Sequence, residues 1–171
     1  MIKKIDWVVG IDPDVDKNGV AFLDCATKRL KIMTYAFADT LDYLRRVKRE
    51  AEVVNAHFIV IIEASWLCKS HWRISPKDSK QMAAAKGNYV GRNHETGRKL
   101  AEMCKYFDIP FKLQKPLALK SGGLHLWKSK DGKITHDELA SFTGITGRTN
   151  QEGRDAALLA WTFAGLPVKF G

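Results

Sequence analysis

Residues 58–62 form an uninterrupted apolar run, Phe-Ile-Val-Ile-Ile, and an acid, Glu63, follows it directly. The run shows no alternation of apolar and polar side chains, which is typical of a strand buried on both faces of a sheet. A sheet that is buried on both faces needs covering elements on each side. The run therefore predicts the central strand of a layered α/β fold.

The other hydrophobic patterns predict the elements around this strand. Turn-rich segments separate three N-terminal strand signals and predict an antiparallel meander over about 5–11, 19–25 and 29–35. A further short strand is expected at 111–113. Helical spacing predicts helices, the first capped by Asp39 or Thr40, over about 40–54, 89–107, 136–142 and 150–164. The expected fold is a mixed sheet, three antiparallel strands and then parallel strands, with helices on both faces.

Composition narrows the class of partner. The 171 residues are expected to form one domain, 1–171, and carry a net charge of +9. Such an excess favours a polyanionic partner, nucleic acid before membrane, and no apolar segment has the length of a membrane span. The cysteines are widely spaced without a CxxC pair, which indicates reduced thiols and a cytoplasmic protein: Cys25, Cys68 and Cys104.

Two of the predicted strands end in a lone acid. Asp12 follows the apolar residues 7–11 in the same way as Glu63 follows 58–62. If the two strands are parallel neighbours, both carboxylates emerge at one edge of the sheet, where ligands bind in open α/β folds. The plainer alternative is that each acid only marks the end of a strand.

A second pair of acids lies in the last predicted helix. Glu152 and Asp155 are three residues apart and share one helix face. Thr149 and Glu152 also match a capping box, which would explain Glu152 without any chemistry. Asp155 lies one turn further in, in an otherwise apolar stretch, where an acid needs a cation or a metal ion.

These acids together suggest metal-dependent phosphodiester cleavage. Four carboxylates are a donor set suited to two hard cations about 4 Å apart, which activate water and stabilise the leaving oxygen. No catalytic Ser-His-Asp or Cys-His arrangement competes convincingly, and the sequence has no GxxxxGK[ST] motif. The expected cofactor is Mg²⁺ or Mn²⁺.

A calcium loop is an alternative explanation for the residues after Asp12. Asp14, Asp16, Asn18 and Gly19 fit the opening of an EF-hand loop. The twelfth position of that loop is Cys25 instead of glutamate, and the flanking segments resemble strands. A hairpin turn is the better explanation.

Several motifs, in this order and spacing, resemble those of the RuvC family of Holliday junction resolvases, within the RNase H-like superfamily. They are GIDP at 10–13, IIEAS at 61–65, Val90-Gly91, Pro116 with Lys120, and EGRDAALLAW at 152–161. The chain departs from the family pattern at Glu152, where aspartate is usual, and at Asp14, where glycine is common.

The resemblance implies an RNase H-like fold and a crossover junction endodeoxyribonuclease. Such an enzyme cuts four-way DNA junctions symmetrically as a homodimer and leaves a 5′-phosphate and a 3′-hydroxyl. The resemblance also implies two metal ions per site, held by four ligands: Asp12, Glu63, Glu152 and Asp155. Lys120 is expected to assist with transition-state charge. Other targets stay open, namely other branched DNA or RNA–DNA hybrids, as does a DNA-binding adaptor without catalysis.

The segment after Glu63 is expected to contact DNA. It carries five cations against Asp78, and basic residues bind phosphates: Lys69, Arg73, Lys77, Lys80 and Lys86. Trp66 resembles the family's aromatic residue near the junction centre, and exposed aromatics can stack on unpaired bases. The expected homodimer surface is the helix around Gly91 and Thr96-Gly97, where small residues permit close approach.

Overall fold

The computed structural model of the chain describes most of the sequence. The described residues are 4–68, 75, 77–117, 120–121, 124–125, 127–129 and 132–169.

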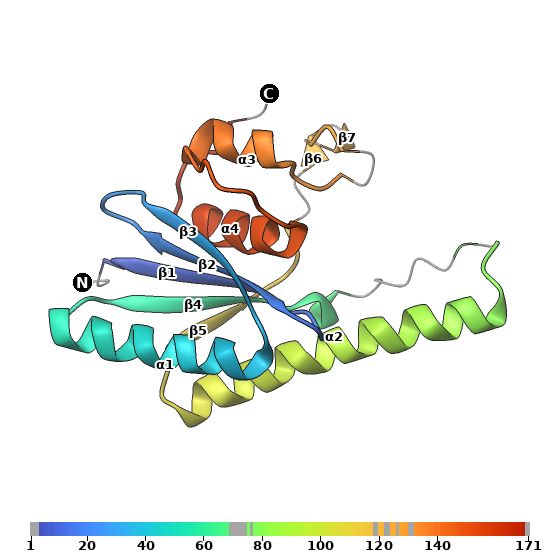
Figure 1. Cartoon of the computed structure of the whole chain (residues 1–171), viewed down its shortest axis with the longest axis horizontal. Helices are drawn as coiled ribbons and strands as arrows, with labels where there is room; N and C mark the ends of the chain where they lie inside the picture. Colours follow the sequence, from blue (N-terminus) through green and yellow to red (C-terminus); the bar gives the residue numbers. More distant parts are fainter. Residues whose placement is uncertain are drawn as a thin grey trace.

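The centre of the molecule is a five-stranded mixed sheet with the order β3-β2-β1-β4-β5 (Figure 1). Its strands are β1 (Trp7–Asp12), β2 (Asn18–Asp24), β3 (Leu30–Tyr35), β4 (Phe58–Glu63) and β5 (Phe111–Gln114). The first three strands are antiparallel, β4 is parallel to β1, and β5 is parallel to β4. The predicted mixed sheet, three antiparallel strands followed by parallel strands, is confirmed. Two short strands, β6 (Lys120–Ser121) and β7 (Leu124–His125), pair separately.

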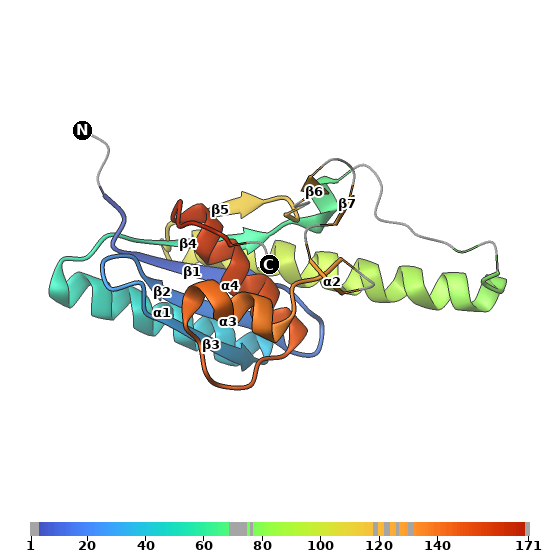
Figure 2. The same cartoon turned by 90° about the horizontal axis from the view of Figure 1, so that it is seen from above.

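Helices cover both faces of the sheet, as predicted. Figures 1 and 2 show α1 and α2 on one face and α4 on the other, with α3 beyond α4. Their bounds are α1 (Phe37–Val54), α2 (Lys80–Tyr106), α3 (His136–Thr143) and α4 (Gln151–Phe163), and a short 3₁₀ turn, η1 (Ser65–Leu67), follows β4.

Two predicted helix starts are wrong. The first helix begins at Phe37, before Asp39 and Thr40, and the Thr40 hydroxyl donates back to the Ala36 carbonyl instead of capping. Helix α2 begins nine residues earlier than expected, after Ser79, whose side chain accepts from the Met82 amide. The sequence pattern missed this first part because it lacks the apolar spacing of a helix packed along one side.

Strand parity divides the core between the two faces. Val9 and Ile11 of β1 face α1 and α2, as do Val60 and Ile62 of β4. The alternate positions face α4 and include Val8 and Ile61. All of these side chains are buried. Burial on both faces confirms the interpretation of the unbroken apolar run at 58–62.

Two glycines allow α4 to lie directly on the sheet. A Cβ atom at Gly10 of β1 would overlap the carbonyl oxygen of Ala156, and one at Gly19 of β2 would overlap that of Glu152. Both obstacles are backbone atoms, which cannot move aside as a flexible side chain can. The close contact sets the height of α4 above the sheet and hence the position of its acids.

Replacing Gly10 tests this packing. We expect Gly10→Ala to lower the free energy of unfolding by roughly 2–4 kcal/mol, since overpacking against backbone forces α4 away from the sheet. The measurement is urea unfolding followed by circular dichroism. Gly147→Ala is the control, because Gly147 has open space around its Cα, and a change below about 0.5 kcal/mol is expected there. Equal effects of the two substitutions would contradict this account of α4 packing.

The turn between β1 and β2 is fastened to α2 by Asp14. One carboxylate oxygen of Asp14 accepts from the Tyr89 hydroxyl (2.6 Å) and the Asn93 amide (3.1 Å). The other accepts from the backbone amides of Asp16 and Lys17. Asp14 is thus a turn and helix anchor. The flanking strands agree with a hairpin and not with the helices of an EF-hand.

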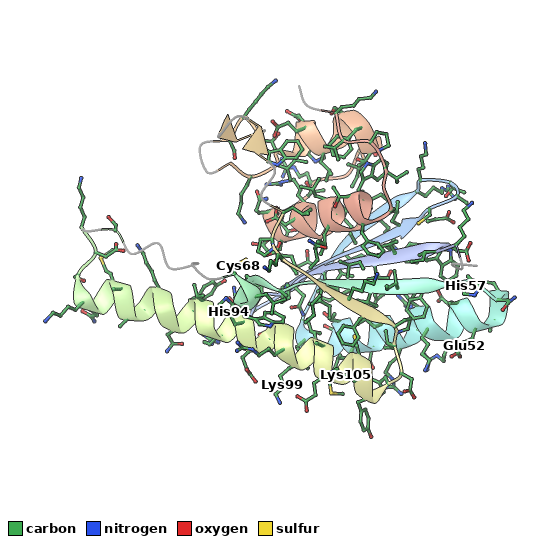
Figure 3. The ribbon with its side chains drawn as sticks, turned by 180° about the vertical axis from the view of Figure 1, so that it is seen from behind. Glu52, His57, Cys68, His94, Lys99 and Lys105 are labelled. Carbon is green, nitrogen blue, oxygen red and sulfur yellow. The ribbon has the colours of Figure 1, made fainter. Side chains whose placement is uncertain are left out.

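The N-terminal part of α2 forms an arm that extends beyond the sheet (Figure 1), and the first side chains of the arm stand clear of the sheet (Figure 3). Further along the arm, Tyr89 and Asn93 contact Asp14 in the β1–β2 turn. Met82 and Tyr89 are 53% and 45% exposed on this arm. None of the helices that the structure describes combines the length and hydrophobicity needed to cross a bilayer.

Candidate active site

Asp12 and Glu63 lie side by side at the carboxyl ends of adjacent strands. Strand β1 pairs in parallel with β4, and the last registered pair, Ile11 with Ile62, directly precedes the two acids. Both acids have the parity of Val8 and Ile61, so both project toward the α4 face. The predicted meeting of the two strand-end carboxylates is confirmed.

Helix α4 brings two further acids to this edge. Asp155 directly precedes Ala156, whose carbonyl oxygen lies against Gly10. The side chain of Asp155 is 19% exposed. Glu152 contacts Gly19 through its backbone, and Gly19 is the pairing partner of Asp12. The helix therefore lies across the two strands next to the end of β1.

The proposed capping box at Thr149 and Glu152 is wrong. The N-cap of α4 is Asn150, whose side-chain oxygen accepts from the Gly153 amide at 3.0 Å. Thr149 instead contacts the ring nitrogen Nδ1 of His136 at 3.1 Å. Asparagine is at least as good an N-cap as threonine. Glu152 therefore has no capping role. Its carboxylate charge contributes to the raised pKa of Asp12.

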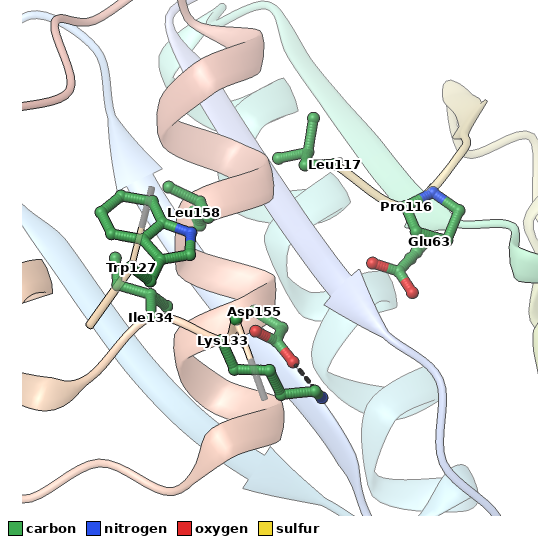
Figure 4. Close-up of a pocket in the computed structure, with 9 residues that line it drawn as sticks. Glu63, Pro116, Leu117, Trp127, Lys133, Ile134, Asp155 and Leu158 are labelled. Carbon is green, nitrogen blue, oxygen red and sulfur yellow. Dashed lines mark hydrogen bonds and ion pairs between the residues drawn. The ribbon is translucent and has the colours of Figure 1, made fainter. Parts of the chain in front are cut away.

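Lys133 joins the acids and was missed in the sequence. Its Nζ forms an ion pair with Asp155 Oδ2 at 2.9 Å (Figure 4). The Asp155 Oδ1 atom accepts from Gln151 Nε2 at 2.8 Å. This ion pair confirms that Asp155 needs a cation. A lysine beside a turn glycine carries no pattern that would distinguish it from a solvent-exposed lysine.

Arg154 holds the segment that carries Lys133. Its guanidinium donates to the carbonyl oxygens of Ile134 (2.9 Å) and Thr149 (2.8 Å) and to the side-chain oxygen of Gln151 (2.8 Å). These partners are neutral, so Arg154 joins chain segments and does not pair with the acids. Its contact at Ile134 fixes the backbone next to Lys133.

The acids repel one another in a partly dehydrated site. Burial and the charges of Glu63, Asp155 and Glu152 raise the pKa of Asp12 well above its ordinary value, against the opposing effect of Lys133. Burial and Asp155 raise the pKa of Glu63 to about 7. Burial acts to lower the pKa of Lys133, but Asp155, Asp12 and Glu63 outweigh it and raise that pKa. The acids of the cluster carry more negative charge than Lys133 can balance.

The donor set suits a hard divalent cation. Carboxylate oxygens are the ligands that Mg²⁺ and Mn²⁺ prefer, and a cation would relieve the repulsion that raises the pKa values of Asp12 and Glu63. Within the described ranges, no three carboxylate, imidazole or thiol groups converge tightly enough to form a ready-made metal site. The ammonium group of Lys133 already binds Asp155, so it and a metal ion would compete for that carboxylate.

A cavity of about 160 Å³ opens beside the cluster. Glu63, Lys133 and Asp155 line it together with Gly132 and several apolar side chains, and Figure 4 shows Glu63 beside Pro116 and Lys133 bonded to Asp155. Those apolar residues are Pro116, Leu117, Trp127, Ile134 and Leu158.

Of the predicted DNA contacts, three lysines are described. Lys77 and Lys80 are exposed at the start of α2, and Lys86 pairs with Asp78 at 2.7 Å. Lys69 and Arg73 lie outside the described residues. Lys120 begins β6, and its role in the chemistry stays a prediction.

Trp66 packs within the chain. A Cβ at Gly97 would overlap its indole ring, and the Arg98 guanidinium lies 5.6 Å from the ring centroid. The expectation that Gly97 serves a dimer surface is wrong, because Trp66 and Pro13 cover it within one chain. Gly91 is open. Stacking of Trp66 on DNA stays a prediction.

No model of a known protein family matches the sequence, and no curated protein matches it. Solved structures that are similar over most of the chain include two of RuvC and one of a poxvirus resolvase. Thermus thermophilus RuvC in complex with a Holliday junction substrate shows 14% identity and a TM-score of 0.47, covering 92% of each chain. A second T. thermophilus RuvC structure shows 12% identity and a TM-score of 0.42, covering 93% of this chain and 96% of the other.

The third structure is Fowlpox virus resolvase with Holliday junction DNA, at 15% identity and a TM-score of 0.39, covering 93% of this chain and 97% of the other. RuvC-type and poxvirus resolvases are thus among the solved proteins to which this chain is similar. Because all three TM-scores lie below 0.5, we base the assignment of fold and function on the strand order and the acidic cluster.

The raised pKa of Glu63 predicts a specific pH dependence of stability. A carboxyl group whose pKa is higher in the folded chain is harder to ionise there than in the unfolded chain. The free energy of unfolding should therefore fall as pH rises from about 4.5 to about 7, with Glu63 contributing on the order of 3 kcal/mol. Thermal unfolding in EDTA across this range measures the effect.

Glu63→Gln should flatten this pH dependence and raise the melting temperature at pH 7.5. Glu95→Gln makes the same chemical change at an exposed site on α2 and should leave the profile unaltered. An unchanged profile in Glu63→Gln would show that Glu63 does not carry the effect.

Proposed function

We propose that this protein is a divalent-metal-dependent DNA endonuclease that resolves four-way junctions by hydrolysing phosphodiester bonds symmetrically. The observation that carries the proposal is that carboxylates from β1, β4 and α4 lie near enough to one another to raise the pKa values of Asp12 and Glu63. Asp155 and Glu63 both act on the pKa of Asp12, although 143 residues separate Asp12 from Asp155 in the sequence. A purely structural sheet edge has no reason to gather mutually repelling acids.

Asp12, Glu63 and Asp155, with Glu152 beside them, are the residues that would hold Mg²⁺ or Mn²⁺, two ions in the full site. Bound metal would supply an activated water and charge stabilisation for the leaving oxygen. The residues themselves fix the position of these charges: β1 and β4 through their register, and Asp155 through the packing of α4. Lys133 supplies a further positive charge to a negatively charged phosphodiester.

DNA is the favoured substrate because of the chain's net charge of +9 and the exposed Lys77 and Lys80. The four-way junction and the homodimer rest on the resemblance of the sequence motifs to the RuvC family. The exposed arm of α2 around Gly91 is open to a partner within this proposal.

Asp12→Asn separates chemistry from binding. The substitution keeps the shape of the side chain but removes a charge and a metal-binding oxygen. We expect cleavage of a synthetic four-way junction in Mg²⁺ or Mn²⁺ to fall by at least about 1,000-fold, while junction binding in a gel-shift assay stays within about threefold.

Asp16→Asn is the matched control, since Asp16 is exposed in the following turn, and it should keep full activity. Full cleavage by Asp12→Asn would rule out this mechanism. If wild type binds junctions but cuts nothing in Mn²⁺, the protein is a DNA-binding adaptor. Equal competition by linear duplex, forks or RNA–DNA hybrid would refute junction specificity.

A further inference from the structure

The residues that follow Asp12 are tied to helix α2 by side chains that the chemistry proposed above does not use. One carboxylate oxygen of Asp14 accepts from the Tyr89 hydroxyl at 2.6 Å and from the Asn93 side-chain amide at 3.1 Å. The side-chain oxygen of Asn93 accepts in turn from the Val15 backbone amide at 2.9 Å. These hydrogen bonds, which we call the α2 latch, join segments at least 75 residues apart in the sequence.

The turn after Asp12 does not need the latch in order to close. The other oxygen of Asp14 accepts from the backbone amides of Asp16 and Lys17, which is the local bonding typical of an aspartate in a turn. Packing does not account for Tyr89 either, because this residue is 45% exposed. Its short hydrogen bond to a carboxylate therefore fixes the position of the turn and not its shape.

Asp12 lies where the support of strand β1 ends. The parallel register of β1 with β4 stops at Ile11 and Ile62, and Asp12 itself pairs with Gly19 of β2, which has no side chain to hold it. The other acids of the cluster repel its carboxylate. Because Asp14 follows Asp12 by only two residues, the latch limits how far this repulsion can displace the end of β1.

Helix α1 holds the far end of the same turn. Asn18 is fully buried; its side-chain oxygen accepts from the Asp14 amide at 3.1 Å, and its side-chain nitrogen donates to the Thr40 hydroxyl at 3.0 Å. The turn is thus fixed to the helices on one face of the sheet, whereas the Asp12 side chain projects toward the α4 face. The latch can therefore set the position of Asp12 without occupying the space that metal and substrate need.

We propose that Asp14, Tyr89 and Asn93 are positioning residues for Asp12: the α2 latch holds the end of β1 so that its carboxylate is in place before a metal ion binds. The inference rests on the proposed nuclease function and adds to it a determinant of metal affinity outside the acidic cluster. With the latch in place, less of the free energy of metal binding is needed to bring Asp12 against its neighbours. Residues that orient metal ligands from outside the ligand set commonly change metal affinity by about 10- to 100-fold.

Calorimetric titration with Mn²⁺ in the absence of DNA tests the latch without any cleavage. Tyr89→Phe removes one hydrogen bond of the latch and no charge, and Asn93→Ala removes the other two. We expect the dissociation constant for Mn²⁺ to rise about threefold in Tyr89→Phe and about tenfold in the double variant. Tyr106→Phe is the matched control: it makes the same change on the same helix at a residue that is 76% exposed, and it should leave the constant unaltered.

Single-turnover cleavage of a four-way junction supplies a second readout. The double variant should need about tenfold more Mn²⁺ than wild type to reach half of its maximal rate. Its maximal rate should stay within about threefold of wild type, because excess metal restores the site that the latch no longer prepares. Junction binding in EDTA should be unaltered.

A lowered melting temperature with unchanged Mn²⁺ affinity would show that the latch only stabilises the fold, and it would overturn the proposal. A change of molar mass in light scattering that accompanies the loss of affinity would also overturn it, since Tyr89 would then act through a partner. If the double variant does not fold, Tyr89→Phe alone decides. A wild type that neither binds Mn²⁺ nor cuts DNA would instead refute the proposed function, which separates that failure from a failure of the latch.

Discussion

The close contact between helix α4 and the sheet determines the rest of this structure. Gly10 and Gly19 have no side chains, so the carbonyl groups of Ala156 and Glu152 can rest where Cβ atoms would otherwise lie. The contact stacks one helix over the ends of β1 and β2, and it places Asp155 near Asp12. Without it, the acids of α4 would lie further from the strand-end acids, and the cluster would lose its geometry.

The close approach of the acids is electrostatically unfavourable and lowers the stability of the folded chain. Asp12, Glu63 and Asp155 repel one another in a partly buried site, and Lys133 compensates only part of that charge. The cluster persists because backbone packing on both faces of the sheet over-determines its position. Sites that bind and react are often destabilising in this way, and the surrounding core carries the energetic cost.

The supporting interactions lie just outside the cluster. Asp14 fastens the turn after Asp12 to α2, and Arg154 joins the backbone next to Lys133 to the start of α4. Both residues are charged, yet neither pairs with the cluster acids. Each instead uses several hydrogen bonds to define the path of a segment that carries a functional side chain. The hydrogen bonds of Asp14 thus give this residue a structural role in the chain.

Much of the fold and the four acids of the site could be predicted from the sequence alone. The unbroken apolar run at 58–62 and the acids that end two strands depend on the period of a strand, which is a local property. Because side chains alternate between the two faces of a strand, this period determines the sheet face on which Asp12 and Glu63 lie when β1 and β4 are neighbours. The spacing of Glu152 and Asp155 likewise placed them on one helix face.

Only the tertiary structure decided which side chains complete the site. Lys133 comes from a turn with no distinguishing pattern, and it reaches Asp155 because Arg154 binds the neighbouring backbone. Asn150 in place of Thr149 caps α4, and Trp66 takes the space at Gly97 that was expected to serve a dimer. The cavity likewise arises between segments distant in sequence. Periodicity is encoded within a few residues, whereas these features depend on contacts between segments, which no single stretch of sequence specifies.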